Sequence, residues 1–194
     1  MISEFTTAFR PAIVMTILFA TLLGLVYPTA LIGIAQVIAP RAANGSLVRD
    51  AKGSVIGSSL IGQSFHDPRY FHGRPSAAGK GYDAANSAGS NLGPASKALA
   101  DRVKTDIASA PPAPGTSVPA DLLTASASGL DPDISPEAAL YQVHRVAAAR
   151  KIDAATLRKL VEQNIAWPLL GVIGEPRVNV LALNLALDRT TARP

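Results

Sequence analysis

Several residues in the second half of the chain are of the types that carry out hydrolytic catalysis. Ser126 or Ser128 could act as the nucleophile, His144 as its general base, and Asp131 as the acid that orients the histidine. The sequence has no GxSxG turn to fix a nucleophile in position, and Ser and Asp in a turn before a helix usually bond to backbone groups. A membrane-anchored hydrolase is therefore only a minor alternative.

Two histidines and an aspartate lie close together earlier in the chain, at His66, Asp67 and His72. Such side chains can bind a metal ion, but these two histidines lack the i, i+4 spacing of a helical ligand pair. We therefore predict that they are solvated loop residues and that the chain holds no metal.

A stretch resembling a phosphate-binding loop runs from Gly73 to Lys80. That motif requires four residues between its glycines and a Ser or Thr after the lysine. Here five residues separate Gly73 from Gly79, and Gly81 follows the lysine. The spacing therefore argues against a phosphate cradle of that type.

The element that anchors all these residues is the segment from Pro11 to Pro40, which carries no charged side chain and is bracketed by Arg10 and Arg41. As a helix it would be about 45 Å long, against about 30 Å for the hydrocarbon core of a bilayer. We predict a transmembrane helix over residues 10–40 after a short tail, residues 1–9. A cleaved signal peptide is the alternative, but its apolar region would be about half as long.

One face of this helix carries small residues at every fourth position: Ala12, Thr16, Ala20 and Gly24. Small residues at this spacing let two helix backbones approach closely in lipid. Pro28 continues the face and lacks the N–H that would bond to the carbonyl of Gly24, so we expect a kink there. Gln36 prefers a polar partner to lipid. We predict that this face, with Gln36, contacts a partner helix.

The remaining residues are numerous enough for one domain with a core. The chain has 194 residues and a formal net charge of +4, with scattered Lys and Arg that form no nucleic-acid patch. It has no cysteine, which excludes disulfides and thiolate metal sites.

We predict a single α+β domain over residues 44–194, rich in irregular loops. The pattern favours a hairpin over 44–57 and helices over 96–109, 136–150 and 154–165, with Ser96, Ser135 and Asp153 as caps. A Pro-rich break covers 110–119, a turn covers 171–176, and a helix is favoured over a strand from Val180, capped by Asn179.

Residues 58–96 are rich in Gly, Ser, Pro and Asn, which is typical of a linker. The interleaved rings of Phe65, Tyr70, Phe71 and Tyr82 argue for an ordered surface built on loops, because aromatic rings need something to pack on.

Several blocks of sequence taken together are far more specific than any one motif. They read GQSF at 62–65, YF at 70–71, GRPSA at 73–77, SAGSNLGP at 87–94, PADLLTASASGLDP at 119–132, QVHRVA at 142–147 and GEPRVNVL at 174–181. In these blocks and in its single N-terminal membrane helix, the chain closely resembles the KdpC family, the C subunits of bacterial Kdp potassium-transporting P-type ATPases.

The resemblance implies a non-catalytic subunit of a potassium uptake complex in the bacterial plasma membrane. Its partners would be the potassium-binding A subunit, the ATP-hydrolysing B subunit and the small F subunit. On the soluble side, the expected contact residues are Gln63, Phe65, Tyr70, Phe71 and Arg74.

The family is also described as a catalytic chaperone that raises the affinity of the B subunit for ATP. A Ser-Gly-Gly-Ser-like stretch in the family would place nucleotide contacts at Ser87, Gly89, Ser90 and Asn91. Ala88 replaces the first glycine here, so we expect ATP to bind weakly or not at all.

The side of the membrane on which the domain lies is not fixed by charge. Arg41, Arg49 and Lys52 follow the helix closely and weakly favour a cytoplasmic domain. The family resemblance implies an extracytoplasmic domain, which we prefer because the charge difference rests on two or three residues.

Overall fold

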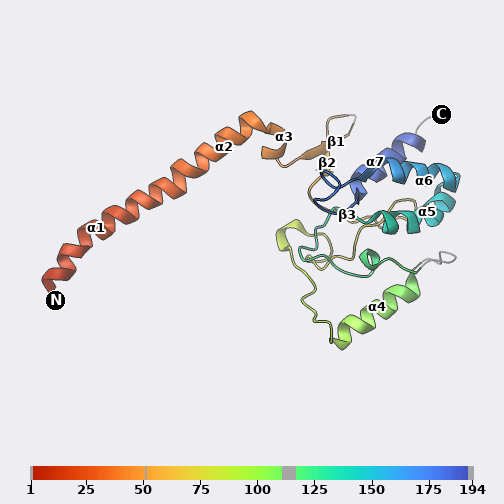
Figure 1. Ribbon diagram of the computed structural model, residues 1–194, viewed down its shortest axis with the longest axis horizontal. Helices are drawn as coiled ribbons and strands as arrows, with labels where there is room; N and C mark the ends of the chain where they lie inside the picture. Colours follow the sequence, from red (N-terminus) through yellow and green to blue (C-terminus); the bar gives the residue numbers. More distant parts are fainter. Residues whose placement is uncertain (1, 51, 111–116, 192–194) are drawn as a thin grey trace. The chain divides into compact units, whose positions relative to one another are not determined.

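The computed structural model describes residues 2–50, 52–110 and 117–191, and the chain divides into two compact units, Met1–Leu47 and Val48–Pro194 (Figure 1). The first unit is almost entirely helical. Helix α1 (Ile2–Thr21), a π-helical turn η1 (Leu22–Val26) and helix α2 (Tyr27–Ile38) follow one another without a break, and a short helix α3 (Pro40–Ala43) comes next.

The stretch Thr7–Ile38 is long and apolar enough to cross a membrane, with a mean hydropathy of 2.1 and none of its most apolar window buried within the chain. This confirms the predicted membrane helix. The helix begins at Ile2, so the expected tail is helical as well, further toward the N-terminus than the apolar run indicates.

The irregularity expected at Pro28 takes the form of the π-helical turn. Proline offers no N–H to the carbonyl four residues back, and its ring collides with that carbonyl unless the turn widens. Just before it, the Tyr27 N–H donates to the Leu22 carbonyl, one residue further back than in an α-helix. The Thr29 hydroxyl donates to the Leu25 carbonyl, which supplies a further bond beside the proline.

The second unit opens with the predicted hairpin. Strand β1 (Leu47–Arg49) pairs with β2 (Val55–Ser58). In the turn, the Asp50 carboxylate accepts hydrogen bonds from the backbone N–H groups of Lys52 and Ser54 at 2.9 and 2.8 Å. Gly53 has a φ of +83°, a conformation that favours glycine.

The predicted helices follow in the predicted order, and the described residues also form three short strands and two 3₁₀ turns that were not predicted. In chain order, these elements are a 3₁₀ turn η2 (Ala84–Asn86), helix α4 (Lys97–Ser109), a 3₁₀ turn η3 (Ala120–Leu122), β3 (Asp133–Ile134), α5 (Pro136–Arg150), α6 (Ala154–Gln163), β4 (Ile165–Ala166), β5 (Arg177–Asn179) and α7 (Val180–Thr191). The short sheet is antiparallel in the order β3-β5-β4. Of the predicted Pro-rich break, residues 111–116 lie outside the described residues.

Three of the four predicted caps are confirmed. Ser135 accepts from the Ala138 N–H at 3.1 Å, Asp153 from Thr156 at 3.0 Å, and Asn179 from Ala182 at 3.0 Å. Ser96 precedes α4, but its side chain makes no capping hydrogen bond, so that prediction is wrong.

Helix α6 also ends two residues earlier than predicted. The Asn164 side chain donates to the Leu160 carbonyl at 2.7 Å and closes the last turn, which frees Ile165 to join the sheet.

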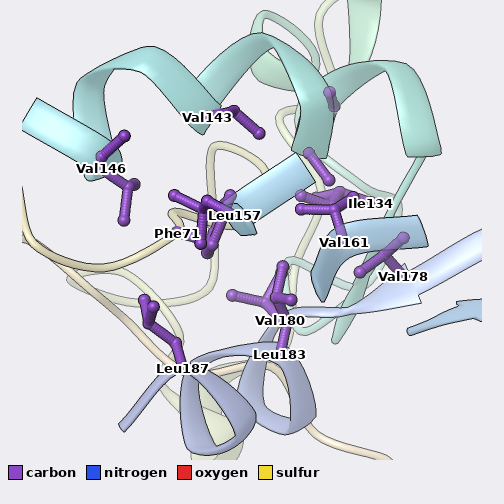
Figure 2. Packing of buried hydrophobic residues seen from close by; sticks show 13 residues of the cluster. Phe71, Ile134, Val143, Val146, Leu157, Val161, Val178, Val180, Leu183 and Leu187 are labelled. Carbon is purple, nitrogen blue, oxygen red and sulfur yellow. The ribbon is translucent and has the colours of Figure 1, made fainter. Parts of the chain in front are cut away.

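The core lies where α5 and α6 pack together and where α7 and β5 close it from below (Figure 2). Its members are fully or almost fully buried: Phe71, Ile134, Ala138, Ala139, Val143, Val146, Ala147, Leu157, Val161, Val178, Val180, Leu183 and Leu187. By contrast, none of the residues of α4 is buried, and Ile107 is 49% exposed. Helix α4 is therefore attached to the domain rather than part of its core.

Phe71 comes from the irregular segment and sits in the centre of this core, completely buried. The prediction that its side chain contacts a partner is therefore wrong, since the ring is used to hold the loop to the helices. The Phe71 N–H donates to the Asn184 carboxamide oxygen and the Asn184 amide donates to the Phe71 carbonyl, both at 2.9 Å.

The next residue is held in the same way from another helix. The His72 N–H donates to the Gln142 side-chain oxygen at 2.8 Å, and the Gln142 amide donates to the His72 carbonyl at 3.0 Å. Asn184 on α7 and Gln142 on α5 thus pair with two successive residues of the loop as neighbouring strands would.

Replacing Asn184 by Leu is expected to destabilise the domain by about 2–6 kcal/mol. The change keeps the approximate size of the side chain but leaves a buried N–H and a buried carbonyl of Phe71 unpaired, each of which costs about 1–3 kcal/mol. Denaturant unfolding of the full chain in detergent, followed by circular dichroism, measures the loss. Gln163→Leu, at an exposed position of α6, is the control and should change stability by less than about 0.5 kcal/mol. A loss for Asn184→Leu no larger than that of the control would contradict this account.

Candidate functional site

A cavity of about 670 Å³ opens in the soluble unit between the irregular segment, the end of α4, the region of η3 and helix α5. Its lining is strongly basic. Four cationic residues line it, Arg74, Lys80, Arg102 and Arg145, together with the three histidines of the chain, His66, His72 and His144. Asp106 is the one acidic residue in that lining, among the described residues. Phe65, Tyr82 and Tyr141 add aromatic surface.

Among these cations, Arg145 is partly buried and is held by neutral hydrogen-bond acceptors. Its guanidinium donates to the Pro68 carbonyl at 2.7 Å and to the Gln142 side-chain oxygen at 2.6 Å, and among the described residues it has no ion pair with a carboxylate. Burial lowers the pKa of Arg145. Burial, and next the charge of Arg145, lower the pKa of His72. A partly desolvated cation without a counter-ion favours an anionic ligand.

Arg102 is nearly as weakly compensated. Its Nε atom is buried without a hydrogen-bond partner and lies 3.8 Å from the Asp106 carboxylate, while another guanidinium nitrogen donates to the Leu123 carbonyl at 3.2 Å. Arg102 and Arg145 were not among the residues predicted from the sequence. The sequence did contain a signal for Arg145. This residue lies in the QVHRVA block, directly before Val146, which is buried on α5.

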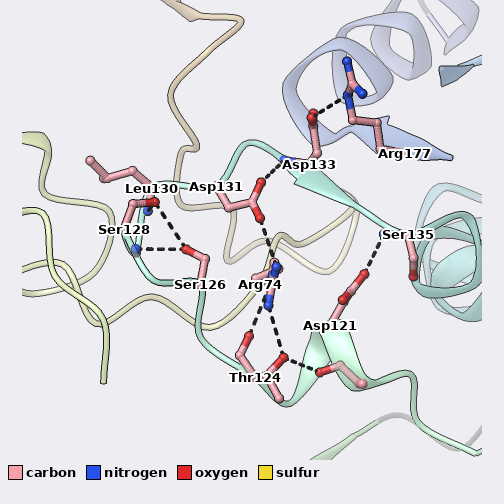
Figure 3. Close-up of polar contacts among 12 residues, drawn as sticks. Arg74, Asp121, Thr124, Ser126, Ser128, Leu130, Asp131, Asp133, Ser135 and Arg177 are labelled. Carbon is pink, nitrogen blue, oxygen red and sulfur yellow. Dashed lines mark hydrogen bonds and ion pairs between the residues drawn. The ribbon is translucent and has the colours of Figure 1, made fainter. Parts of the chain in front are cut away.

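Arg74, which was predicted to contact a partner, is already engaged within the domain (Figure 3). It forms an ion pair with Asp131 at 3.0 Å and donates to the hydroxyl and the carbonyl of Thr124 at 3.2 and 3.3 Å. These bonds join the irregular segment to the 120–131 region. Arg74 therefore shapes one wall of the cavity.

Tyr82 fixes the start of the Gly73-to-Lys80 stretch. Its hydroxyl donates to the Arg74 carbonyl at 2.7 Å, and burial raises its pKa to about 12. A Cβ atom added at Gly73 would lie 2.4 Å from this hydroxyl. Gly73 is thus required for close packing against Tyr82.

Two other predicted contact residues, Phe65 and Tyr70, form a half-buried aromatic pair with ring centroids 5.7 Å apart. Arg150 lies 4.6 Å from the centre of the Tyr70 ring and pairs with Asp188 at 2.7 Å. The amide of Gln63, also predicted as a contact, donates to the Ile56 carbonyl at 2.9 Å. Each of these side chains has a structural partner and keeps part of its surface exposed.

The residues considered for a hydrolytic triad are not brought together. Ser126 and Ser128 accept hydrogen bonds from the N–H groups of Gly129 and Leu130 at 2.9 and 3.1 Å, and so stabilise their own turn. Asp131 is paired with Arg74. Within the described ranges, no hydrogen bond or ion pair links His144 to either serine or to Asp131.

The residues considered for a metal site each serve another contact. The His66 ring bonds to the Ser64 hydroxyl at 2.6 Å, and the His72 ring to the Asp67 carbonyl at 3.1 Å. Hydrogen bonds from Arg69 lower the pKa of Asp67 to about 2. In the part of the chain that the structure describes, no three His, Cys, Asp or Glu side chains form a metal-binding group.

The segment considered for nucleotide contacts, residues 87–91, packs against the 126–129 turn instead of the cavity. The Ser87 hydroxyl and the Ala88 N–H both donate to the Ser128 carbonyl, at 2.9 and 3.0 Å. A Cβ atom at Gly89 would lie 2.9 Å from the Ala127 carbonyl oxygen. None of the cavity's lining residues comes from this segment, which includes Ser90 and Asn91.

On the membrane helix, the small-residue face coincides with a groove. A hollow of about 260 Å³ is lined by Phe9, Ala12, Ile13, Thr16 and Ile17. No atom lies within 4 Å of a Cβ atom added at Gly24. Gln36 is exposed, as a contact with a partner helix requires, and Asn44 of the same unit donates to its side-chain oxygen at 3.0 Å. Its amide therefore has a partner within the chain.

Comparison with known proteins covers almost the whole chain. The family model described as "KdpC: K+-transporting ATPase, c chain" matches residues 9–189. A "Potassium-transporting ATPase KdpC subunit" of Caulobacter vibrioides is 57% identical over 180 residues, covering 92% of this chain and 91% of the relative. Proteins of the same name from Bradyrhizobium diazoefficiens and Rhodopseudomonas palustris are 54% and 55% identical, covering 95% and 92% of this chain and 98% and 96% of the relatives. With one helix able to span a membrane among the described residues, followed by an α+β domain, the chain belongs to the KdpC family of potassium-transporting ATPase subunits.

Proposed function

We propose that this chain is a non-catalytic accessory subunit that assembles and stabilises an ATP-driven potassium uptake complex in the bacterial plasma membrane. The observation that carries the proposal is the similarity, over nine-tenths of both chains, to KdpC subunits of potassium-transporting ATPases. The separation of the serines from His144 supports a role without catalysis. The partners are the potassium-binding A subunit, the ATP-hydrolysing B subunit and the small F subunit.

The membrane helix supplies one assembly surface. Its small-residue face is open along Ala12 and Thr16 and again at Gly24, where a neighbouring backbone has room to approach. Association of helices in lipid is driven by such close packing, because lipid offers no hydrophobic driving force between them.

Gly24→Leu should weaken recovery of the complex by tenfold or more, because the new side chain holds the partner helix away. Co-purification of the other subunits with the tagged full chain measures this. Gly33→Leu is the matched control, since Gly33 also has open space around it and lies off the small-residue face. Ser126→Ala and His144→Ala complexes should assemble and keep their ATPase rate. Equal recovery of the Gly24 and Gly33 variants would remove this face as an interface.

We further propose that the Val48–Pro194 unit lies on the extracytoplasmic side, where its loop surface meets the A subunit near the ion entrance. The half-buried pair Phe65 and Tyr70 supports this, because it leaves aromatic surface exposed on a rigid loop. Protease added to intact spheroplasts should therefore digest the domain. Protection in spheroplasts with digestion in inverted vesicles would reverse the proposed topology.

A second candidate function is that of a catalytic chaperone that binds ATP for the B subunit. The basic cavity favours it, because Arg102 and Arg145 offer poorly compensated positive charge beside aromatic surface. The cavity, and not the 87–91 segment, is the place where an anion would be held.

We expect ATP to bind the full chain in detergent only weakly, with no saturation in the micromolar range, because Asp106, the one carboxylate among the described lining residues, lies 3.8 Å from Arg102 and is not free to hold magnesium. Calorimetric titration of ATP at modest salt measures this. Any weak binding should be lost in the double variant Lys80→Gln with Arg102→Gln and kept in Ser90→Ala with Asn91→Ala. Micromolar binding abolished by the second pair would contradict the assignment to the cavity and favour the 87–91 segment.

A further inference from the structure

A second surface of the soluble unit, formed by the segment between β4 and β5, exposes far more apolar side chain than the rest of the unit. Residues 167–173 form a hairpin loop, hereafter the 167–173 loop, whose large side chains point into solvent. The exposed fractions are 70% for Trp167, 68% for Leu169, 83% for Leu170, 80% for Val172 and 61% for Ile173. Large apolar residues exposed elsewhere in the described part of this unit reach at most 61% and stand singly or in one pair. A contiguous apolar patch of this kind marks an interaction site.

The tip of the loop has a backbone conformation that leucine rarely adopts. Leu170 and Gly171 have φ values of 55° and 75°, and the Val172 N–H donates to the Leu169 carbonyl at 3.3 Å. Two central residues with positive φ are typical of a type I′ turn, which favours Asn-Gly. Leucine at the first of these positions is strained and exposed at once. Its apolar side chain therefore points to a contact outside the domain.

Part of the backbone of the loop is hydrogen-bonded within the loop itself. Leu169 and Ile173 exchange two backbone hydrogen bonds, both at 3.1 Å, and the Gly171 N–H donates to the Pro168 carbonyl at 3.1 Å. Pro168 has no N–H to satisfy. Between Ile165 and Gly174 there is no charged side chain, and the indole of Trp167 is the one side chain that can donate a hydrogen bond. A segment without charges, with its hairpin closed by backbone hydrogen bonds, can lie at the boundary between headgroups and acyl chains, where its other backbone groups still reach water.

The short connection to the membrane helix keeps the second unit near lipid. Nine residues, 39–47, separate the end of the membrane helix at Ile38 from the start of the second unit at Val48. Even fully extended they span only about 30 Å, so the domain remains near the membrane surface in any orientation. Tryptophan is enriched where headgroups meet acyl chains. The nearest charges toward the C-terminus, Glu175 and Arg177, lie at the base of the loop, where they can stay in water.

We propose that the 167–173 loop inserts into the boundary between the headgroups and acyl chains of the membrane that holds the chain's own helix. The loop thus gives the domain a second membrane attachment and restricts its rotation about the short connection after Ile38. This inference needs only the chain and lipid, so its test is independent of the subunits that the chain joins.

Trp167 is the single tryptophan of the chain and reports directly on the loop. The full chain is reconstituted in vesicles of phosphatidylethanolamine and phosphatidylglycerol that contain phosphatidylcholine brominated either near the headgroup or near the chain ends. We expect blue-shifted tryptophan emission and strong quenching by the bromines near the headgroup. Water-like emission without quenching would overturn the proposal. Shielding that develops only after the other subunits are added would also overturn it, in favour of a protein partner.

The double variant Leu170→Asn with Val172→Asn tests the same loop without unfolding it, because an asparagine immediately before Gly171 suits the turn. Loss of two apolar side chains should lower the fraction of inserted loop by tenfold or more, and the quenching with it. Leu92→Asn, a change of the same kind outside the loop, is the control and should leave the quenching unchanged. Equal quenching in the double variant and the control would contradict insertion by this loop.

Discussion

Phe71 and His72 have no strand beside them, and two buried carboxamide side chains bond their backbone groups instead. Asn184 pairs with Phe71 and Gln142 pairs with His72, each as acceptor and as donor. A buried loop can exist only if its N–H and carbonyl groups find such partners. This arrangement places the Phe71 ring in the core and leaves the following residues, 73–82, to form the wall of the cavity. The irregular segment is thus as firmly positioned as a strand, although it has almost no regular structure.

The same contacts concentrate positive charge at the cavity. The Gln142 oxygen that accepts from His72 also accepts from Arg145, so the bond that fixes the loop also orients a guanidinium. Elsewhere in the lining, the ion pair between Arg74 and Asp131 compensates one positive charge. Arg145 has no carboxylate partner among the described residues and Arg102 has only a long contact with Asp106, which is why the cavity favours an anion, while the triad and metal hypotheses find no assembled site.

The membrane helix obeys a separate constraint, because a bilayer offers no water to its backbone. Pro28 removes a hydrogen bond that must be replaced within the segment, and the π-helical turn at 22–26 with the Thr29 hydroxyl accommodates this loss. The 167–173 loop meets part of the same requirement outside the helix, because Leu169 and Ile173 exchange backbone hydrogen bonds and no side chain of the loop is charged. Both parts are therefore suited to surroundings of low polarity, one as a span and the other as a shallow attachment.

The sequence by itself determined the elements whose signals are local. The charge-free run at 11–40, the caps at Ser135 and Asp153 and the turn at Asp50 depend only on neighbouring residues, and the structure has them where they were predicted. The similarity of several sequence blocks to one family was also readable without coordinates. Contacts between residues far apart in the chain were not. Only the tertiary structure showed that Phe71 is a core residue, that Gln36 bonds to Asn44, and that Arg102 and Arg145 face one cavity. The physical reason is that burial and charge compensation depend on which segments meet, and a single sequence gives the chemistry of each segment but not its neighbours.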